Sequence, residues 1–285
     1  MPTVDVILLG WNDAPSLPKV LQSLKEQTAE PQRIIYVDDD STDDSREIAE
    51  SFDVDVIIRL KRKKRVYGGF PILTENVNAG LREVKRDNPD FFMVAAGDVV
   101  LERCYIEKLL NRFELDEKLV IASGVIEGEH NVPTAPRGAG RMHCMSWWEK
   151  HIKWYPFGFL WESYAPYKAQ SLGYRTRSFS DIRMVALRPT RPYKPIYGYA
   201  MRQLGYHPLY AILRCFMGFL YKPENGVTML RTYRTKSDIL EPIDPDLARW
   251  IKHEQMKHLL QYLSSPAMIS QKLRNLRVRL GGFSG

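Results

Sequence analysis

Short apolar runs that alternate with segments of helical periodicity constrain the fold of this chain most strongly. The apolar runs occur at residues 4–9, 33–37, 54–58, 91–95 and 119–123. Runs of this length with few polar interruptions are typical of buried parallel strands. Helical periodicity lies between them, at residues 17–24, 78–86 and 105–113. Repeated alternation of strand and helix predicts an α/β fold, with a mostly parallel sheet flanked by helices.

Three prolines, Pro189, Pro192 and Pro195, mark a boundary later in the chain. Proline continues neither a helix nor an inner strand. With 285 residues and 44% apolar side chains, the chain is long enough for one large domain with an appendage. We therefore expect a domain of residues 1–190 and an extension of residues 191–285. The extension has helical periodicity at residues 197–221, 244–263 and 266–280.

Charge is distributed unevenly along the chain. Residues 1–150 carry 20 basic and 26 acidic side chains, a net of −6, whereas residues 151–285 carry 21 and 8, a net of +13. The two halves therefore face different electrostatic partners. A strongly basic segment suits nucleic acid or an anionic membrane surface. Because no nucleic-acid recognition motif is present, we do not expect nucleic acid as a partner.

Cysteine usage and hydropathy indicate where the protein works. Three cysteines, far apart in the sequence and without C-x-x-C spacing, favour neither a disulfide framework nor a structural zinc site. No basic stretch followed by an apolar one begins the chain, which argues against a secretory signal. The most apolar run, residues 209–220, contains Arg214 and is too short for a bilayer span of ~20 residues. We expect a cytoplasmic protein, or a peripheral one at the inner face of the cell membrane.

Carboxylates follow two of the predicted strands directly. Asp38 and Asp39 come after residues 33–37, and Asp98 comes after residues 91–95 and two small residues. Ligands of parallel sheets bind at the carboxyl ends of the strands. A carboxylate there can accept hydrogen bonds from a nucleotide, or hold a cation beside a diphosphate. The alternative is a helix cap, which we favour for Asp43 and Asp44.

Five segments in order then resemble one family: residues 4–12, 21–28, 34–43, 76–81 and 96–102. Together they are similar to the nucleotide-binding half of family 2 glycosyltransferases, which have the GT-A fold and invert the sugar configuration. The resemblance covers residues 4–124 and implies an acceptor half at residues 125–190. It implies that Asp39 meets the nucleotide base and that Asp98 is the last aspartate of the D-x-D metal motif. The nucleotide contacts that it implies come from Gly10, Asn12, Asp38, Asp39 and Asn78.

A weaker resemblance concerns residues 161–174, which are similar to the catalytic segment of the same family. It places Glu162 where the family has its catalytic aspartate, as the base for the acceptor hydroxyl. The alternative for Glu162 is a surface carboxylate. Trp161 and Arg141 are the acceptor-side candidates, although core packing is the ordinary role of clustered aromatics.

The sequence departs from the family pattern at three places. Ala96 replaces the first aspartate of D-x-D, Ala186 stands where many relatives have a metal-binding histidine, and Gly68-Gly69 replaces a Gly-Lys pair. A Mn²⁺ or Mg²⁺ ion would therefore rely on Asp98, the diphosphate and water. Alternatively, arginine and lysine neutralise the diphosphate. The basic run at residues 61–65 suits phosphate contacts, or is simply solvated.

The function that these features imply is transfer of a sugar from a UDP- or GDP-linked donor to a hydroxyl acceptor, such as a polyprenyl-linked glycan. Residues 266–280 combine apolar and basic side chains, so this segment suits an anionic membrane surface, its own domain or a partner. The alternatives are a GT-A-like nucleotide-sugar-binding protein that has lost catalysis, suggested by Ala96 and Ala186, or a membrane-surface adaptor.

Overall fold

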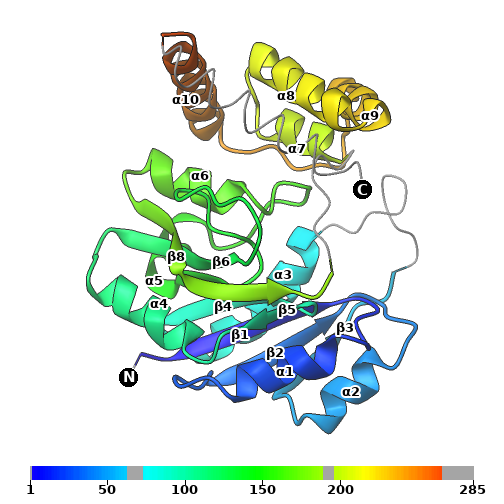
Figure 1. The fold of residues 1–285 in the computed structure, drawn as a ribbon, viewed down its shortest axis with the longest axis vertical. Coiled ribbons are helices and arrows are strands. Elements are labelled where there is room, and N and C mark those ends of the chain that lie inside the picture. Colours follow the sequence, from blue (N-terminus) through cyan, green and yellow to red (C-terminus); the bar gives the residue numbers. More distant parts are fainter. Residues whose placement is uncertain (1, 63–72, 189–195, 265–285) are drawn as a thin grey trace. The chain divides into compact units, whose positions relative to one another are not determined.

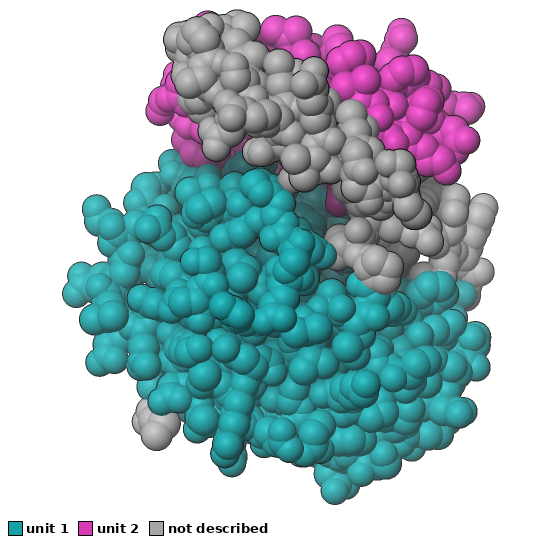
Figure 2. All heavy atoms as spheres, viewed as in Figure 1, with its two compact units in different colours: residues 1–190 teal, residues 191–285 magenta. Residues whose placement is uncertain are grey.

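A computed structural model describes residues 2–62, 73–188 and 196–264 of the chain. The chain divides into two compact units, Met1–Thr190 and Arg191–Gly285, which are coloured separately in Figure 2. The expected segment at residues 266–280 and the Gly68-Gly69 pair lie outside the described residues.

An eight-stranded mixed sheet forms the centre of the first unit (Figure 1). Its strand order is β3-β2-β1-β4-β7-β6-β8-β5. The four strands β3, β2, β1 and β4 run parallel, β7 is antiparallel to both β4 and β6, and β8 is parallel to β6. The strands are β1 (Val4–Gly10), β2 (Arg33–Asp38), β3 (Val56–Arg59), β4 (Phe91–Ala96), β5 (Val99–Leu101), β6 (Leu119–Ile126), β7 (Arg141–Cys144) and β8 (Arg175–Ala186).

Helices cover both faces of this sheet because consecutive strand residues point to opposite faces. Val6 and Leu8 of β1 belong to one cluster with apolar residues of α1 and α4. The alternate residue Ile7 lies against α3, so closely that a Cβ at Gly80 would collide with it. The helices of this unit are α1 (Leu17–Lys25), α2 (Ser45–Ser51), α3 (Leu73–Asp87), α4 (Tyr105–Glu114), α5 (Met145–His151) and α6 (Tyr164–Ser171).

Strand register brings the predicted site residues to one edge of the sheet. Gly10 pairs with Asp38, Asp38 with Arg59, and Leu9 with Ala96. The carboxyl ends of β1 to β4 therefore lie side by side. Because β7 runs antiparallel to β4, with Val94 paired to Arg141, the first residue of β7 lies at this same edge.

The second unit is helical in the part that the structure describes. It contains α7 (Tyr197–Gln203), α8 (Pro208–Tyr221), α9 (Pro223–Arg234) and α10 (Pro245–Ser264). The prediction of one helix over residues 197–221 was wrong, because the chain turns between α7 and α8, where Gly205 has φ +64°. Within the described ranges, no helix combines the length and the apolar character needed to cross a membrane.

Candidate functional site

The loop after β1 is fixed to the loop after β2. The Ser41 hydroxyl accepts a hydrogen bond from the Asn12 amide at 3.0 Å, and the Asn12 side-chain oxygen accepts one from the Thr42 amide at 2.8 Å. Asn12 adopts φ +52° to make this turn. A Cβ at Gly10 would collide with the ring of Tyr36, so Gly10 leaves room for a core side chain. Both residues therefore shape this loop.

Asp38 and Asp39 are both buried, but their carboxylates bind different partners. The Asp38 carboxylate accepts a hydrogen bond from the Ser41 amide at 3.0 Å and so closes the loop. The Asp39 amide donates to the Gly10 carbonyl at 2.9 Å, and its carboxylate accepts from the Arg62 guanidinium at 2.6 Å. The same guanidinium contacts Glu75 and Asn76 of α3. Arg62 thus holds the carboxylate that we expect to meet the base.

Asn78 lies on α3 and binds the backbone of Tyr155. Its side-chain amide donates to the Tyr155 carbonyl at 2.8 Å, and its oxygen accepts from the Tyr155 amide at 2.9 Å. Both ends of the amide are therefore used to hold the aromatic segment. The expected nucleotide contact of Asn78 stays a prediction, and it requires these two bonds to open.

A guanidinium group joins two carboxylates beyond the ends of β1 and β4. The Asp98 carboxylate accepts a hydrogen bond from Nε of Arg188 at 3.0 Å, and Nη2 of the same arginine contacts Asp13. The side chain of Asp13 is only 3% exposed, whereas that of Asp98 is 26% exposed. A Cβ at Gly97 would fall on the Asp13 carboxylate, so glycine at this position lets the two carboxylates approach.

The electrostatics of Asp13 reflect its burial. Loss of hydration raises its pKa to about 6, and the negative charge of Asp98 acts in the same direction. A hydrogen bond from the Trp11 amide and the charge of Arg188 oppose this rise. Two carboxylates here meet one guanidinium, so acidic side chains outnumber basic ones in this group. A net negative charge attracts a further cation and repels an unaccompanied diphosphate.

Asp13 and Asp98 suit a hard divalent cation. Mn²⁺ or Mg²⁺ is commonly held by one or two carboxylates together with phosphate oxygens, and two carboxylates already converge here on one cationic group. No group of three or more His, Cys, Asp or Glu side chains that could hold a metal ion occurs in the described ranges. Phosphate and water oxygens would complete such a site.

Glu162 is exposed. The buried side chain of Arg141 binds the backbone around it. The Arg141 side chain is fully buried, donates to the carbonyls of Glu162 and Trp161 at 2.9 and 3.2 Å, and stacks 4.4 Å from the Trp161 ring. Because Arg141 is the first residue of β7, this arrangement fixes the Glu162 segment at the edge that carries Asp98.

The acceptor-side contact expected of Arg141 stays a prediction. The structure shows the side chain buried and bonded to the backbone at Trp161 and Glu162, so direct contact with an acceptor requires the side chain to become exposed. Trp161 is also buried and packs against the loop before β7, where a Cβ at Gly138 would collide with its ring and lie 2.9 Å from Oε1 of Glu162. Both residues therefore pack on the buried side of the Glu162 segment.

Sequence reasoning missed Asp13 and Arg188 as members of the candidate site, and it gave Arg62 a different contact. Asp13 lies in a turn directly after the first strand, and that position was the available signal. The run at residues 61–65 was expected to contact phosphate or solvent, but Arg62 contacts Asp39. Nothing in the sequence indicated Arg188, which lies 175 residues from its partner Asp13.

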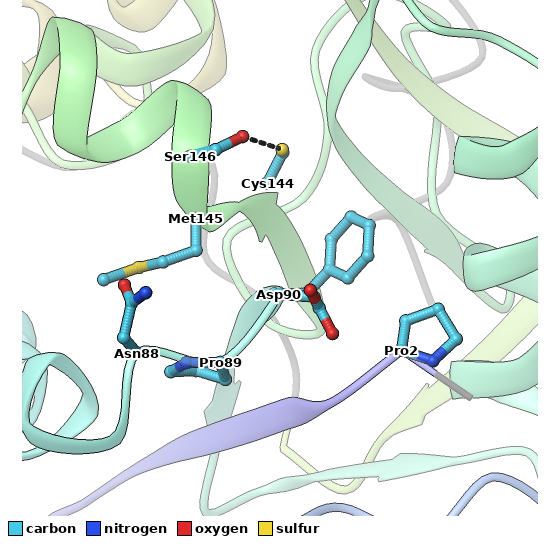
Figure 3. A pocket seen from close by; sticks show the side chains of 8 residues that line it. Pro2, Asn88, Pro89, Asp90, Cys144, Met145 and Ser146 are labelled. Atoms are coloured by element: carbon cyan, nitrogen blue, oxygen red, sulfur yellow. Dashed lines mark hydrogen bonds between the residues drawn. The ribbon is translucent and has the colours of Figure 1, made fainter.

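A hollow of about 550 Å³ lies elsewhere, beside the start of β4 and the end of β7. Figure 3 shows its lining, which includes Pro2, Asp90 and Cys144. It contains none of the predicted site residues. Since ligands of parallel sheets bind at the opposite, carboxyl edge, this hollow is not our candidate.

Comparison with known proteins agrees with the geometry. The model of the family described as "Glycosyl transferase family 2" matches residues 5–179. The chain belongs to glycosyl transferase family 2. It is therefore a glycosyltransferase, and its mixed sheet with flanking helices is the GT-A fold that the sequence resemblance implied. No match was found among curated proteins.

Several solved structures share the fold of this glycosyltransferase. A mannosyltransferase from Pyrobaculum calidifontis, in complex with GDP-Man and Mn²⁺, is 16% identical, with a TM-score of 0.55 over 99% of this chain and 81% of that one. S. aureus TarS (residues 1–349), in complex with UDP-GlcNAc, is 14% identical, with a TM-score of 0.60 over 99% and 91%. Glucosyl-3-phosphoglycerate synthase from Mycobacterium tuberculosis, in complex with Mn²⁺, UDP and glucosyl-3-phosphoglycerate, is 14% identical, with a TM-score of 0.53 over 71% and 77%.

Proposed function

We propose that this glycosyltransferase moves a sugar from a UDP- or GDP-linked donor to a hydroxyl acceptor, with inversion at the anomeric carbon. One observation carries the proposal. Strand register and the Arg141 contacts bring Asp39, Asp98 and the Glu162 segment to the same edge of the sheet. The structural neighbours, whose complexes contain GDP-Man, UDP or UDP-GlcNAc, support a nucleotide sugar as the donor.

The nucleoside would bind against Asp39. A buried carboxylate at this position accepts hydrogen bonds from the N–H groups of a base, and it now accepts one from Arg62. Binding would therefore require Arg62 to share or leave Asp39. Asp38, Asn12 and Gly10 would hold the two loops that enclose the nucleoside.

The diphosphate would bind beside Asp98, Asp13 and Arg188. Asp13 and Asp98 would hold a divalent cation, which would supply positive charge to the diphosphate leaving group. The guanidinium of Arg188 has five N–H groups, and two of them contact the carboxylates. The others can turn to phosphate oxygens, so Arg188 would add a second source of positive charge.

Glu162 would act as the base. The acceptor oxygen forms a bond to the anomeric carbon while the bond from that carbon to the diphosphate oxygen breaks. The hydroxyl proton passes to Glu162, and the nucleoside diphosphate leaves with the bonding electron pair. Attack from the side opposite the leaving group inverts the configuration. Arg141 contributes by fixing the backbone on both sides of the Trp161–Glu162 bond.

The acceptor that we propose is a polyprenyl-linked glycan, in polysaccharide or glycoprotein glycan synthesis. The basic residues after position 150 support it, because the net charge of +13 there attracts a phosphate-linked acceptor. A protein working on such an acceptor would be peripheral at the inner face of the cell membrane.

Calorimetric titration of the full chain with UDP and with GDP, each with and without Mn²⁺, tests the donor side. We expect one nucleotide to bind, and Mn²⁺ to raise its affinity at least about tenfold, because the Asp13–Asp98–Arg188 group is negative without a further cation. Binding of neither nucleotide would contradict the proposal.

A second candidate function is nucleotide-sugar binding without transfer, and Ala96 and Ala186 favour it because both replace family metal ligands. Donor hydrolysis or transfer by the wild type, measured beside Glu162→Gln and the exposed control Glu117→Gln, separates the two candidates. Turnover that falls at least about 100-fold in Glu162→Gln alone supports catalysis by this carboxylate. Nucleotide binding with no turnover in any of the three proteins supports the second candidate.

A further inference from the structure

Helix α8 of the second unit has its large apolar side chains on the outside. Six of them are between 38% and 55% exposed. They are Leu209, Ile212, Leu213, Phe216, Phe219 and Leu220. They recur at intervals of three and four residues, which places them along one broad face of the helix. Soluble proteins rarely expose a continuous apolar surface of this kind, and such patches mark interaction sites.

The buried face of α8 is made of small residues instead. Ala211, Cys215 and Gly218 face inward, and α8 packs against α9 there. A Cβ at Gly226 of α9 would collide with the backbone of Phe219, and one at Gly218 would lie 3.0 Å from the sulfur of Met229. The two helices therefore approach closely at Gly218 and Gly226, with the small residues of α8 facing α9 and its large apolar residues outside.

This distribution is the reverse of an ordinary amphipathic helix in water, where large apolar residues face the core. Contact through small residues, with large apolar residues outward, is typical of helices that pack in lipid. With 14 residues, α8 is about 21 Å long, shorter than the ~30 Å hydrocarbon core. Its length suits a helix that lies along the membrane surface with one face among the acyl chains.

The net charge of the segment from α7 to α9 favours an anionic membrane over a second copy of the chain. From α7 to α9, residues 197–234 carry five basic side chains and one acidic side chain, Glu224. The basic residues are Arg202, Arg214, Lys222, Arg231 and Arg234. Anionic headgroups attract such a surface, whereas two copies meeting through this face would bring like charges together.

We propose that α8 lies in the interface of an anionic membrane, with Ile212, Phe216 and Phe219 inserted among the acyl chains. The proposal goes beyond the proposed function and does not depend on it, because vesicle binding is measured without nucleotide or sugar. It assigns the membrane contact to a face of α8.

Sedimentation of the full chain with vesicles tests the proposal. Vesicles of phosphatidylcholine mixed with phosphatidylglycerol should bind the protein, more weakly as salt rises and more weakly still without phosphatidylglycerol. In the variant Ile212→Ser/Phe216→Ser the partition coefficient should fall at least about tenfold. The control Leu115→Ser changes a leucine that is 81% exposed at the end of α4, and it should bind as the wild type does.

Circular dichroism and gel filtration of each variant separate the alternatives. Wild-type vesicle binding by the double variant overturns the proposal. The proposal is also overturned if the wild type is a dimer that does not bind vesicles and the double variant is a monomer. In that case a second copy of the chain covers the face. The proposal is overturned too if the wild type does not bind vesicles and the double variant is less thermally stable than the wild type. In that case the face packs within the chain.

A second measurement requires no loss of apolar surface. In Phe216→Trp, brominated acyl chains should quench the added tryptophan fluorescence, because bromine quenches only at short range. In Leu115→Trp the added fluorescence should not be quenched. Equal quenching in the two variants would mean that position 216 lies no deeper in the membrane than position 115. That result would contradict the inference.

Discussion

At the scale of single residues, two arginines hold the carboxylates that we assign to ligand binding. Arg62 contacts Asp39, and Arg188 contacts both Asp13 and Asp98. Each guanidinium offsets a buried or half-buried negative charge, whose desolvation is otherwise unfavourable. The carboxylates are therefore suited to the N–H donors of a base at Asp39 and to a divalent cation at Asp13 and Asp98.

Asp39→Asn tests the contact with the base. The variant keeps the shape of the side chain and loses its charge, so nucleotide affinity should fall about tenfold or more. Calorimetric titration measures the change. Asp44→Asn, an exposed residue before α2 with no side-chain cap bond, is the matched control. Equal affinities in the two variants would remove Asp39 from the nucleotide site.

His143 predicts how stability depends on pH. It is fully buried, with its ring stacked 4.5 Å from that of Phe92. Burial lowers its pKa well below 6.5, and the charge of Arg141 lowers it further. Below pH 6.5 the unfolded chain therefore binds a proton that the folded protein does not, and the free energy of unfolding falls as pH falls.

Denaturant unfolding at a series of pH values checks this expectation. The wild type should lose stability steadily below pH 6.5, and His143→Phe should lose less over the same range. The exposed His253→Gln, whose side chain is 77% exposed, should follow the wild type. Parallel curves for His143→Phe and the wild type would show that the buried ring does not control the slope.

At the scale of elements, the apolar runs predicted β1, β2, β3, β4 and β6, because buried parallel strands leave a signal in the sequence. Strand β8 was missed, because it alternates buried residues with exposed charged ones such as Arg175, Arg177 and Arg183. Its partners β6 and β5 are distant in sequence. Pairing between distant segments cannot be read from local composition.

The same limit applies to the site. The positions of Asp38, Asp39 and Asp98 follow from the strands that they end, so their grouping was predictable. The contacts of Arg188 and Asn78 were not, because their partners lie on elements far away in the chain. The sequence alone does not distinguish a side chain that binds a ligand from one that binds a neighbouring loop.

Gly138 gives a prediction at the scale of elements. A Cβ at this position would collide with the Trp161 ring and approach Glu162. Gly138→Ala should therefore displace the Glu162 segment and lower turnover about tenfold or more, while nucleotide affinity stays unchanged. Gly128→Ala, where nothing lies near the added carbon, is the control. Normal turnover in Gly138→Ala would separate this loop from catalysis.

At the scale of the whole molecule, the chain consists of two compact units. All of the residues that we propose for the nucleotide site belong to the first, and α7 to α10 belong to the second. Multidomain proteins commonly unfold in more than one step. The net charge of +7 is likewise a sum over dissimilar parts, since residues 191–285 carry 15 basic and 6 acidic side chains.

Scanning calorimetry should therefore show two unfolding transitions. A nucleotide present at about 100 times its Kd should stabilise the transition of the first unit by about 2.7 kcal/mol and leave the other unchanged. A single transition that moves as a whole would show instead that the two units unfold together.

Arg188 has a position with a mechanical consequence. It pairs with Asp13 and Asp98, and the second unit begins only three residues later, at Arg191. The guanidinium therefore anchors the chain just before it enters the helical unit. If a diphosphate draws Arg188 away from the two carboxylates, the last described residue of the first unit loses this anchor at the same moment.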